Sequence, residues 1–209
     1  MKRGLLIIVS GFSGAGKGSI VRGLIRKHDN YALSVSATTR QPRDGEIDGR
    51  DYFFISKSQF EKMIAEDRLL EFAKYVDNYY GTPADYVDSM LNQGKDVILE
   101  IEMQGAMKVK CRIPDAVTVF VSTKDAETLQ ARLKGRGTET LEQIGKRLER
   151  AVEEADLMKQ YDYILINDDL DGAIDTLHGI ICTEHKRTSY NDDFITEIQK
   201  DLKTRFGKE

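Results

Sequence analysis

The chain has 209 residues, of which 31 are Lys or Arg and 35 are Asp or Glu, for a net charge of -4. This length suits roughly one compact domain with an inserted lobe, and 40% hydrophobic residues exclude a wholly disordered chain. Because the chain has no net positive charge, we do not expect it to bind long nucleic acids or membrane surfaces. Any anion must then bind at a local cluster of positive groups. The apolar run Leu5 to Val9 is far shorter than a membrane span of ~20 residues, and no cleavage pattern follows it, so we expect a cytoplasmic protein.

Cys111 and Cys182 are two isolated cysteines. They lack the paired spacing of a zinc site, and two in this length do not make a disulfide scaffold. We therefore expect both to be reduced residues that pack as small hydrophobic side chains.

Unbroken apolar runs rich in β-branched and aromatic residues alternate along the chain with segments of helical periodicity. Unbroken runs are typical of strands buried on both faces, and strands that alternate with helices predict a parallel sheet. The expected fold is thus α/β, with a central parallel sheet flanked by helices. The predicted strands are Leu5 to Val9, Val97 to Ile101, Val117 to Val121 and Tyr163 to Ile166.

Helical stripes follow the first run, precede the last one and close the chain. The two closing helices are expected to pack on the outside of the sheet. The apolar positions are Ile20, Val21, Leu24 and Ile25; Leu141, Ile144, Leu148, Ala151, Ala155 and Met158; Leu170, Ile174, Leu177 and Ile181; and Ile195, Ile198, Leu202 and Phe206.

Residues 34–83 break this rhythm with prolines, glycines and aromatic clusters, which favour short antiparallel strands and turns. One helix is expected within the segment, begun by a capping box of Ser58 and Glu61 and carrying Phe60 on its apolar side. We predict a small α+β lobe at about 34–83, inserted after the second strand of the main sheet. Residues 1–33 and 84–209 would then form the core of a single domain.

A glycine-rich loop ending in lysine separates the first strand from the first helix. Its successive backbone N–H groups, the helix N-terminus and the lysine ammonium are the elements of a triphosphate-binding loop. Serine or threonine usually follows the lysine and supplies a hydroxyl for magnesium, but this chain has a glycine there and its hydroxyl one residue later. The predicted ATP-binding residues of the loop are Gly11, Phe12, Ser13, Gly14, Ala15, Gly16, Lys17, Gly18 and Ser19.

Arg40 and Arg43 are three residues apart in a turn that contains a proline. Arginine forks match phosphate oxygens, so this pair is a candidate site for a second phosphate, although a solvated basic turn has the same composition. Tyr52 and Tyr80 are hydroxyl donors that could contact a base or a phosphate, but each one taken alone is more often a core residue.

The sequence resembles guanylate kinases from the first strand to about Asp169. The motifs that carry the resemblance are Ser-Val-Ser-Ala-Thr-Thr-Arg-Gln-Pro-Arg, Gly-Arg-Asp-Tyr-Phe-Phe, Leu-Leu-Glu-Phe-Ala, Asn-Tyr-Tyr-Gly-Thr-Pro, Glu-Ile-Glu-Met-Gln-Gly, Gly-Arg-Gly-Thr-Glu-Thr and Asn-Asp-Asp. The resemblance implies ATP-dependent phosphorylation of GMP to GDP, with Mg²⁺, on a P-loop core with a GMP-binding lobe and a lid. The last forty residues carry no such signature.

In that family, positions matching Arg40, Arg43, Tyr52 and Tyr80 bind the GMP phosphate, and those matching Ser36, Glu71 and Thr82 surround the guanine. The hydrogen-bonding groups of guanine are consistent with these roles. A carboxylate can accept hydrogen bonds from N1–H and N2–H₂ of guanine together, and a hydroxyl can donate one to O6.

Glu100 follows the apolar stretch Val97 to Leu99 of a predicted strand, where P-loop enzymes place an acid toward magnesium. The family often has aspartate here, so contact with GMP and contact with a metal-bound water both stay open; Ser19 is the other metal candidate. The lid is expected at about 134–147, with Arg132, Arg136 and Arg147 directed at donor phosphates, and Lys17, Arg136 and Arg147 are the predicted catalytic residues. Asn167 and Asp168 match positions near the donor adenine.

Three other functions fit the sequence less well. Guanylate-kinase-like scaffold modules bind proteins without catalysis, but they usually lack an intact lysine loop. A kinase for another monophosphate is disfavoured by Glu71 and Thr82, and a regulatory GTPase by the absence of an Asn-Lys-x-Asp segment. The sequence leaves open whether the protein is a monomer or a homo-oligomer.

Overall fold

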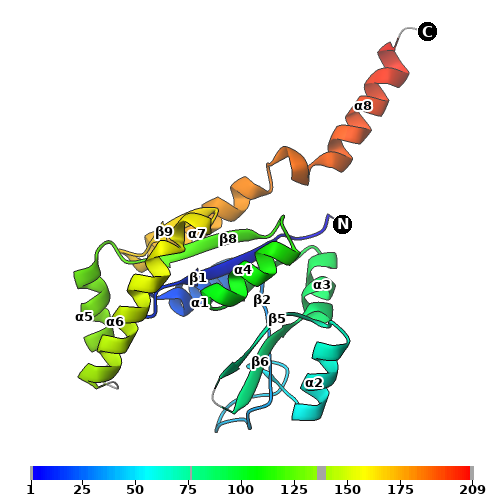
Figure 1. Cartoon of the computed structure of the whole chain (residues 1–209). Coiled ribbons are helices and arrows are strands. Elements are labelled where there is room, and N and C mark those ends of the chain that lie inside the picture. Colours follow the sequence, from blue (N-terminus) through cyan, green and yellow to red (C-terminus); the bar gives the residue numbers. More distant parts are fainter. Residues whose placement is uncertain (1, 76, 136–139, 208–209) are drawn as a thin grey trace.

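The computed structural model describes residues 2–75, 77–135 and 140–207. A five-stranded parallel sheet with strand order β2-β7-β1-β8-β9 forms its centre (Figure 1). The predicted α/β fold with a parallel sheet flanked by helices is confirmed. The strands are β1 (Leu6–Gly11), β2 (Tyr31–Leu33), β7 (Asp96–Glu100), β8 (Val117–Ser122) and β9 (Tyr163–Ile166).

Strand β1 lies in the middle of the sheet, and every one of its residues is buried. Ile8 pairs in register with Leu99 on one side and with Thr118 on the other. The four strands predicted from apolar runs are all present. The fifth, β2, has only three residues and pairs at the edge with β7, so no apolar run announces it.

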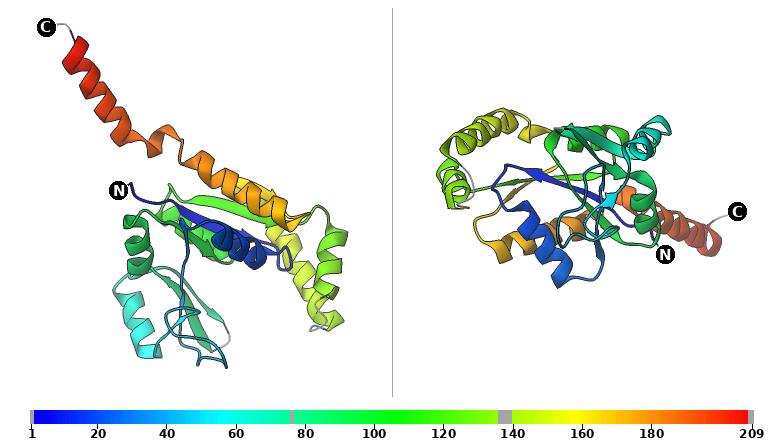
Figure 2. Two further views of the ribbon diagram at one scale, coloured as in Figure 1. Left: turned by 180° about the vertical axis from the view of Figure 1, so that it is seen from behind. Right: turned by 90° about the horizontal axis from the view of Figure 1, so that it is seen from below.

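Helices cover both faces of the sheet and its carboxyl end. Helices α1 and α7 pack together on one face, nearest the viewer in the left view of Figure 2, and α4 covers the other face (Figure 1). Helices α5 and α6 lie at the end where β1 runs into the loop. Their bounds are α1 (Lys17–Lys27), α4 (Met103–Arg112), α5 (Ala126–Gly135), α6 (Leu141–Asp156) and α7 (Leu170–Glu184), with short 3-10 turns at Met158–Gln160 and Thr188–Tyr190.

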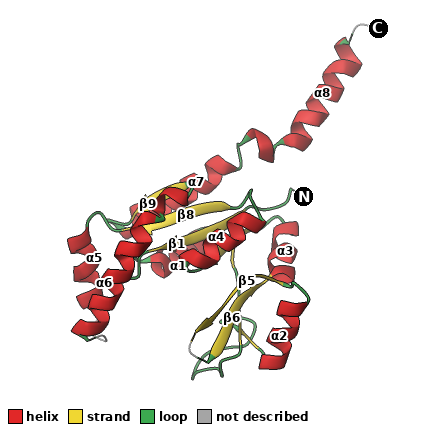
Figure 3. Ribbon diagram, in the orientation of Figure 1, coloured by secondary structure: helices red, strands yellow, loops and turns green. Residues whose placement is uncertain are grey.

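A second sheet of four strands, in the order β4-β3-β6-β5, lies between β2 and β7 in the chain and hangs below the main sheet in Figure 3. Helix α2 packs on it through Phe60, which is fully buried in a separate small core with Ala37 and Leu69. Helix α3 leads back to the main core. The bounds are β3 (Ala37–Thr38), β4 (Phe53–Phe54), α2 (Lys57–Ala65), β5 (Leu69–Tyr75), β6 (Asn78–Pro83) and α3 (Ala84–Asn92).

Two details of this lobe differ from expectation. Strand β4 runs parallel to β3, whereas only antiparallel strands were predicted. The capping box of α2 is formed by Ser56 and Gln59, not by Ser58 and Glu61. The chain turns into the helix at Ser56, whose side chain accepts from the backbone N–H of Gln59, so Ser58 and Glu61 already lie inside the helix.

The prediction that both closing helices pack on the sheet is wrong for the second. Helix α7 buries Ala173, Ile174, Leu177 and Ile181, as expected. Helix α8 (Asp192–Phe206) extends away from the body of the protein in all views, and none of its described residues is buried (Figures 1 and 2).

Both cysteines are free, as expected, but both are exposed. Cys111 lies on α4 and Cys182 on α7, each on the side of its helix that faces away from the core. The prediction that they pack as core residues is therefore wrong. Within the described residues, no helix is both long and apolar enough to cross a membrane.

Candidate active site

The loop between β1 and α1 depends on glycines at two close approaches. Gly11 and Gly16 have φ values of 138° and 94°, which side chains rarely tolerate. A β-carbon on Gly11 would lie 2.0 Å from the carbonyl oxygen of Val121, and one on Gly16 would lie 2.4 Å from Nδ2 of Asn167. The glycine pattern read from the sequence is thus required by the packing of the loop against β8 and the residue after β9.

Lys17, the first residue of α1, reaches back across the loop. Its Nζ donates to the carbonyl oxygens of Gly11 at 2.7 Å and Phe12 at 3.1 Å. The first turn of α1 reads Lys-Gly-Ser-Ile and carries no acidic side chain, so the positive end of its dipole is not neutralised locally. The ammonium and the helix N-terminus together make this end of the sheet suited to an anion.

A pocket of about 290 Å³ opens at this loop. Glu100, at the end of β7, faces Lys17 and Arg22 within it. Glu100 is exposed to the pocket, yet the protein crowded around its carboxylate raises its pKa through desolvation, while Lys17 and Arg22 act in the opposite direction. The lining residues are Ser13, Gly14, Gly16, Lys17, Gly18, Ser19, Arg22 and Glu100.

Arg132 and Asn167 brace the loop from behind. The side-chain amide of Asn167 is buried and donates to the carbonyl oxygen of Ala15 at 2.7 Å. Arg132 donates to the carbonyl oxygens of Ala15 at 3.3 Å and Asn167 at 2.8 Å. Asp168 is exposed and lies 3.4 Å from Lys124. In this structure Arg132 and Asn167 therefore support the loop, and their expected contacts with ATP stay predictions.

Helix α6 connects the expected lid to the loop. Arg147 donates a hydrogen bond to the hydroxyl of Ser13, which brings a predicted catalytic residue to the loop. One turn later, Arg150 pairs with Glu102 at 2.6 Å and with Glu154 at 3.0 Å, tying α6 to the segment that follows β7. Within the expected lid at about 134–147, Arg136 and residues 137–139 lie outside the described residues.

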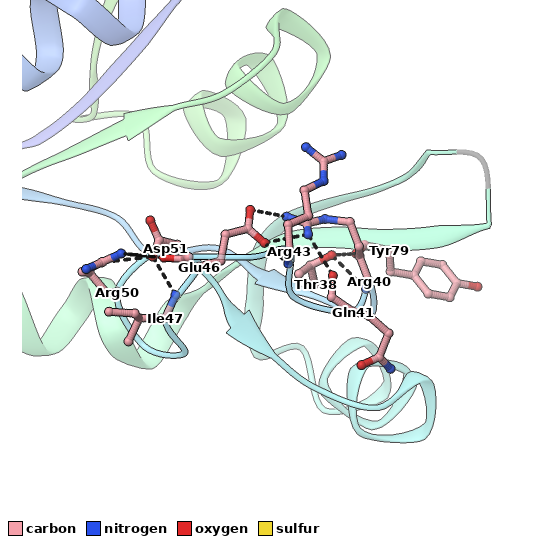
Figure 4. A network of polar contacts seen from close by, with 10 residues as sticks. Thr38, Arg40, Gln41, Arg43, Glu46, Ile47, Arg50, Asp51 and Tyr79 are labelled. Carbon is pink, nitrogen blue, oxygen red and sulfur yellow. Dashed lines mark hydrogen bonds and ion pairs between the residues drawn. The ribbon is translucent and has the colours of Figure 1, made fainter.

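A second cationic cluster lies in the lobe, around Arg40. Its guanidinium makes two parallel hydrogen bonds with the carboxylate of Glu46, at 2.8 and 2.9 Å, and Glu46 also accepts from the backbone N–H of Arg43 at 2.7 Å (Figure 4). These bonds lower the pKa of Glu46 to about 2 and raise that of Arg40. The turn therefore holds the Arg40 fork and the Arg43 backbone at fixed positions.

Aromatic rings surround the Arg40 guanidinium. It lies 5.2 Å from the ring centroid of Tyr52 and 5.6 Å from that of Phe54. The rings of Tyr52 and Tyr80 meet edge-on, with centroids 6.2 Å apart. Three of the four residues predicted to hold the acceptor phosphate, Arg40, Tyr52 and Tyr80, are thus brought together from separate parts of the lobe.

Glu71 and Thr82 also meet, across strands β5 and β6. The buried hydroxyl of Thr82 donates to Oε1 of Glu71 at 2.7 Å. Desolvation raises the pKa of Glu71, although Thr82 and the more distant Lys108 lower it. The carboxylate is therefore oriented but poorly hydrated, and a ligand that donates hydrogen bonds would relieve that cost.

Gly105 on α4 faces the same carboxylate. A β-carbon on Gly105 would lie 3.0 Å from Oε2 of Glu71. Helix α4 thus closes one side of the Glu71 position. Ser36 is half-buried beside β3, and its carbonyl oxygen accepts from the backbone N–H of Phe53 at 2.9 Å.

Sequence reasoning missed three residues that shape these clusters. Arg22 follows Gly18 by one helical turn, which is the spacing of neighbours on a helix face. Glu46 lies in the same short turn as Arg40 and Arg43, and an acid among arginines indicates pairing. Gly105 ends the Glu-Ile-Glu-Met-Gln-Gly motif, but nothing in that motif indicates a role for the glycine in the Glu71 position.

The fold and the loop define a P-loop phosphate-binding protein of the α/β class with a second, arginine-containing lobe. The family model for guanylate kinase matches residues 3–184. A guanylate kinase from Caldanaerobacter subterraneus is 48% identical over 200 residues, covering 96% of this chain and 97% of that protein. One from Halalkalibacterium halodurans is 52% identical over 185 residues, covering 88% and 90%.

The crystal structure of guanylate kinase from Anaplasma phagocytophilum superposes with a TM-score of 0.71 at 26% identity, covering all of this chain and 98% of that one. This chain belongs to the guanylate kinase family.

Proposed function

We propose that this protein transfers the terminal phosphoryl group of ATP to GMP, giving ADP and GDP. This proposal rests on three features that occur together in a chain of this family. Two are separate anion sites, at Lys17 and at Arg40, and the third is the oriented carboxylate of Glu71. One site suits a triphosphate, the other a monophosphate, and the carboxylate suits a base with adjacent N–H donors.

The donor triphosphate is proposed to occupy the pocket at the loop. Backbone N–H groups of the loop, the N-terminus of α1 and the Lys17 ammonium would hold its outer phosphates. Phosphate oxygens would compete with the carbonyl oxygens of Gly11 and Phe12 for Lys17. Arg147, already beside Ser13, would meet charge that develops on the transferring group.

The acceptor monophosphate is proposed to bind at Arg40, Arg43, Tyr52 and Tyr80. Glu46 holds the Arg40 guanidinium in place, so binding costs little side-chain freedom. Because Glu46 accepts from both ends of the fork, the phosphate would either displace this carboxylate or bind the N–H donors that it leaves. An oxygen of the GMP phosphate attacks the terminal phosphorus as the bond to the bridging oxygen of ADP breaks. Because this acceptor is already an anion, no general base is needed.

The guanine is proposed to bind at Glu71. Its N1–H and N2–H₂ would donate to the carboxylate that Thr82 orients, and Ser36 would contribute a further polar contact. Adenine has no donor at N1, so the same carboxylate would face an acceptor and repel it. This difference would select GMP over AMP.

Magnesium is the metal that the family implies. Among the described residues, no group of three or more His, Cys, Asp or Glu side chains could hold a metal ion. The pocket nonetheless offers oxygen donors from Glu100 and Ser19, which suits an ion that takes most of its ligands from water and substrate phosphates. When bound there, Mg²⁺ would neutralise charge on the donor phosphates.

We also propose that residues 34–83 act as the GMP-binding lobe and residues of about 134–147 as a lid over the donor, within one domain. The separate small core around Phe60 supports a lobe that keeps its shape when it moves. Closure of two parts over both nucleotides would exclude water from the transferring phosphoryl group.

The test is an ADP-release assay with ATP, Mg²⁺ and each common nucleoside monophosphate. We expect turnover with GMP at least about a hundredfold more efficient than with AMP, as expected when a buried polar group is left unpaired by the wrong base. Arg40→Ala should raise the KM for GMP, while Arg50→Ala, an exposed arginine of the same lobe paired with Asp51, serves as the matched control. Comparable turnover of AMP and GMP, or none with either, would refute the proposal.

A further inference from the structure

Helix α8 carries an exposed apolar ridge, defined here as Phe194, Ile198, Leu202 and Phe206. These side chains are 64%, 40%, 50% and 75% exposed, and none of the described residues of α8 is buried. They recur every four residues, so they form one continuous ridge along the helix. Large apolar side chains gathered in this way mark an interaction surface rather than ordinary surface scatter.

The root of α8 is fixed to the body of the protein. The amide of Asn191 donates to the carbonyl oxygens of His185 at 3.0 Å and Arg187 at 2.7 Å, and its oxygen accepts from Lys2 at 2.9 Å. The Tyr190 hydroxyl donates to the carbonyl oxygen of Arg3. These contacts hold α8 in the projecting direction seen in Figures 1 and 2.

The ridge reads nearly the same in both directions, as aromatic, aliphatic, aliphatic and aromatic. The charges of α8, in contrast, differ between its two ends. The first turn contains Asp192 and Asp193, and the last contains Lys203 and Arg205. Two copies of α8 laid antiparallel would therefore place aromatic against aromatic and aliphatic against aliphatic. The same arrangement would bring the acidic end of each helix to the basic end of the other, whereas a parallel pair would bring like charges together.

We propose that α8 is a self-association element that pairs antiparallel with α8 of a second copy of this chain. Ridges of residues four apart pack into one another with a helix crossing of about 50°, so the pair is a crossed contact rather than a long coiled coil. Since α8 projects from the body, an antiparallel pair puts the two bodies at opposite ends of the contact.

The expected dimer is weak. Fifteen residues span only about 22 Å of helix, and a single crossing of such helices buries less than the roughly 1,200 Å² typical of stable interfaces. A lipid surface is a poorer partner for the ridge than a second copy of α8. Helices that lie on membranes are rich in Lys and Arg on their polar side, whereas α8 has four acidic residues and three basic ones. Association should therefore be reversible and concentration-dependent.

The first test is sedimentation of the full chain over a wide range of protein concentration. We expect a monomer–dimer equilibrium that Leu202→Glu weakens by at least about tenfold, because a charge would be buried in the contact. Thr196→Glu, on the opposite side of α8, is the matched control and should leave the equilibrium unchanged. Kinase turnover and the thermal midpoint should be unaffected in both variants, which shows that each is folded. A monomer at every concentration, or equal effects of the two substitutions, would overturn the proposal.

The second test fixes the orientation of the pair. In a background with Cys111→Ser and Cys182→Ser, one population carries Phe194→Cys and another Phe206→Cys, and a short thiol-specific cross-linker is added. The two positions are twelve residues, or about 18 Å, apart on one helix, so an antiparallel pair links only unlike chains in a mixture. Cross-links within either population alone, or no excess of the mixed product, would overturn the antiparallel arrangement.

Discussion

Gly18 lies directly against the carboxylate of Glu100. A β-carbon at Gly18 would be 3.3 Å from each Glu100 oxygen and 3.0 Å from Nη1 of Arg22. Phosphate-binding loops usually have serine or threonine at this position. The missing side chain leaves the space that the long Glu100 side chain occupies, so the unusual glycine and the unusual glutamate fit each other.

This fit predicts coupling between the two positions. Gly18→Ala should lower kcat by about three- to tenfold, because Glu100 and Arg22 must move, while the thermal midpoint stays equal or rises through the ~0.5–1 kcal/mol helix preference of alanine. Glu100→Asp in the same chain should restore part of the loss, with a coupling energy of about 1 kcal/mol. Steady-state kinetics on the four variants of the cycle measure this, and additive effects would dismiss the relationship.

Lys17→Ala should lower kcat by about a hundredfold or more while GMP binding stays close to that of the parent, because the ammonium acts on the donor phosphates and not in the lobe. Calorimetric titration with GMP and single-turnover kinetics separate the two effects. Turnover within about threefold of the parent would remove Lys17 from the proposed chemistry.

Glu71→Gln should weaken GMP binding and yet stabilise the empty protein. The amide oxygen can still accept from Thr82, but the amide would present N–H groups to those of guanine, an unmet donor that costs roughly 1–3 kcal/mol. Because desolvation raises the pKa of Glu71, its ionised form destabilises the folded state above that pKa, and this penalty is relieved as the pH falls through it. Neutral glutamine removes the penalty, so the thermal midpoint at neutral pH should rise by ~2–4 °C.

The same carboxylate should set the pH dependence of GMP affinity. Guanine needs the ionised form, so the KM for GMP should rise as the pH falls through the raised pKa of Glu71, at a higher pH than an ordinary glutamate would cause. In Glu71→Gln this step should be absent. A KM profile identical in parent and variant would show that Glu71 does not contact the base.

Gly105→Ala should raise the KM for GMP several-fold with little effect on the KM for ATP. Its β-carbon would lie 3.0 Å from Oε2 of Glu71, so the carboxylate would have to turn away from its position. Gly179→Ala is the matched control, since it is also a helical glycine and a β-carbon there meets nothing within 4 Å. Both variants should be at least as stable as the parent by thermal unfolding, and equal KM values for GMP would show that Gly105 does not limit the site.

The phosphate-binding loop could be predicted from the sequence because its physics is local. Glycines that must adopt positive φ, a lysine and the start of a helix occupy consecutive positions, so the loop is visible before any tertiary contact is known. The strands β1, β7, β8 and β9 were equally visible, since burial on both faces requires unbroken apolar runs. The guanylate kinase motifs then supplied the expected roles of Arg40, Glu71 and Thr82.

The tertiary structure decided what those local signals leave open. An amphipathic stripe has the same pattern whether it covers a sheet, as in α7, or remains uncovered, as in α8. Asn167 and Arg132 read as ligand-binding residues, but only the fold shows their hydrogen bonds to the backbone of the loop. The contacts of Gly18 with Glu100 and of Gly105 with Glu71 join residues far apart in the chain. Such contacts depend on how strands and helices pack, which no local pattern in the sequence encodes.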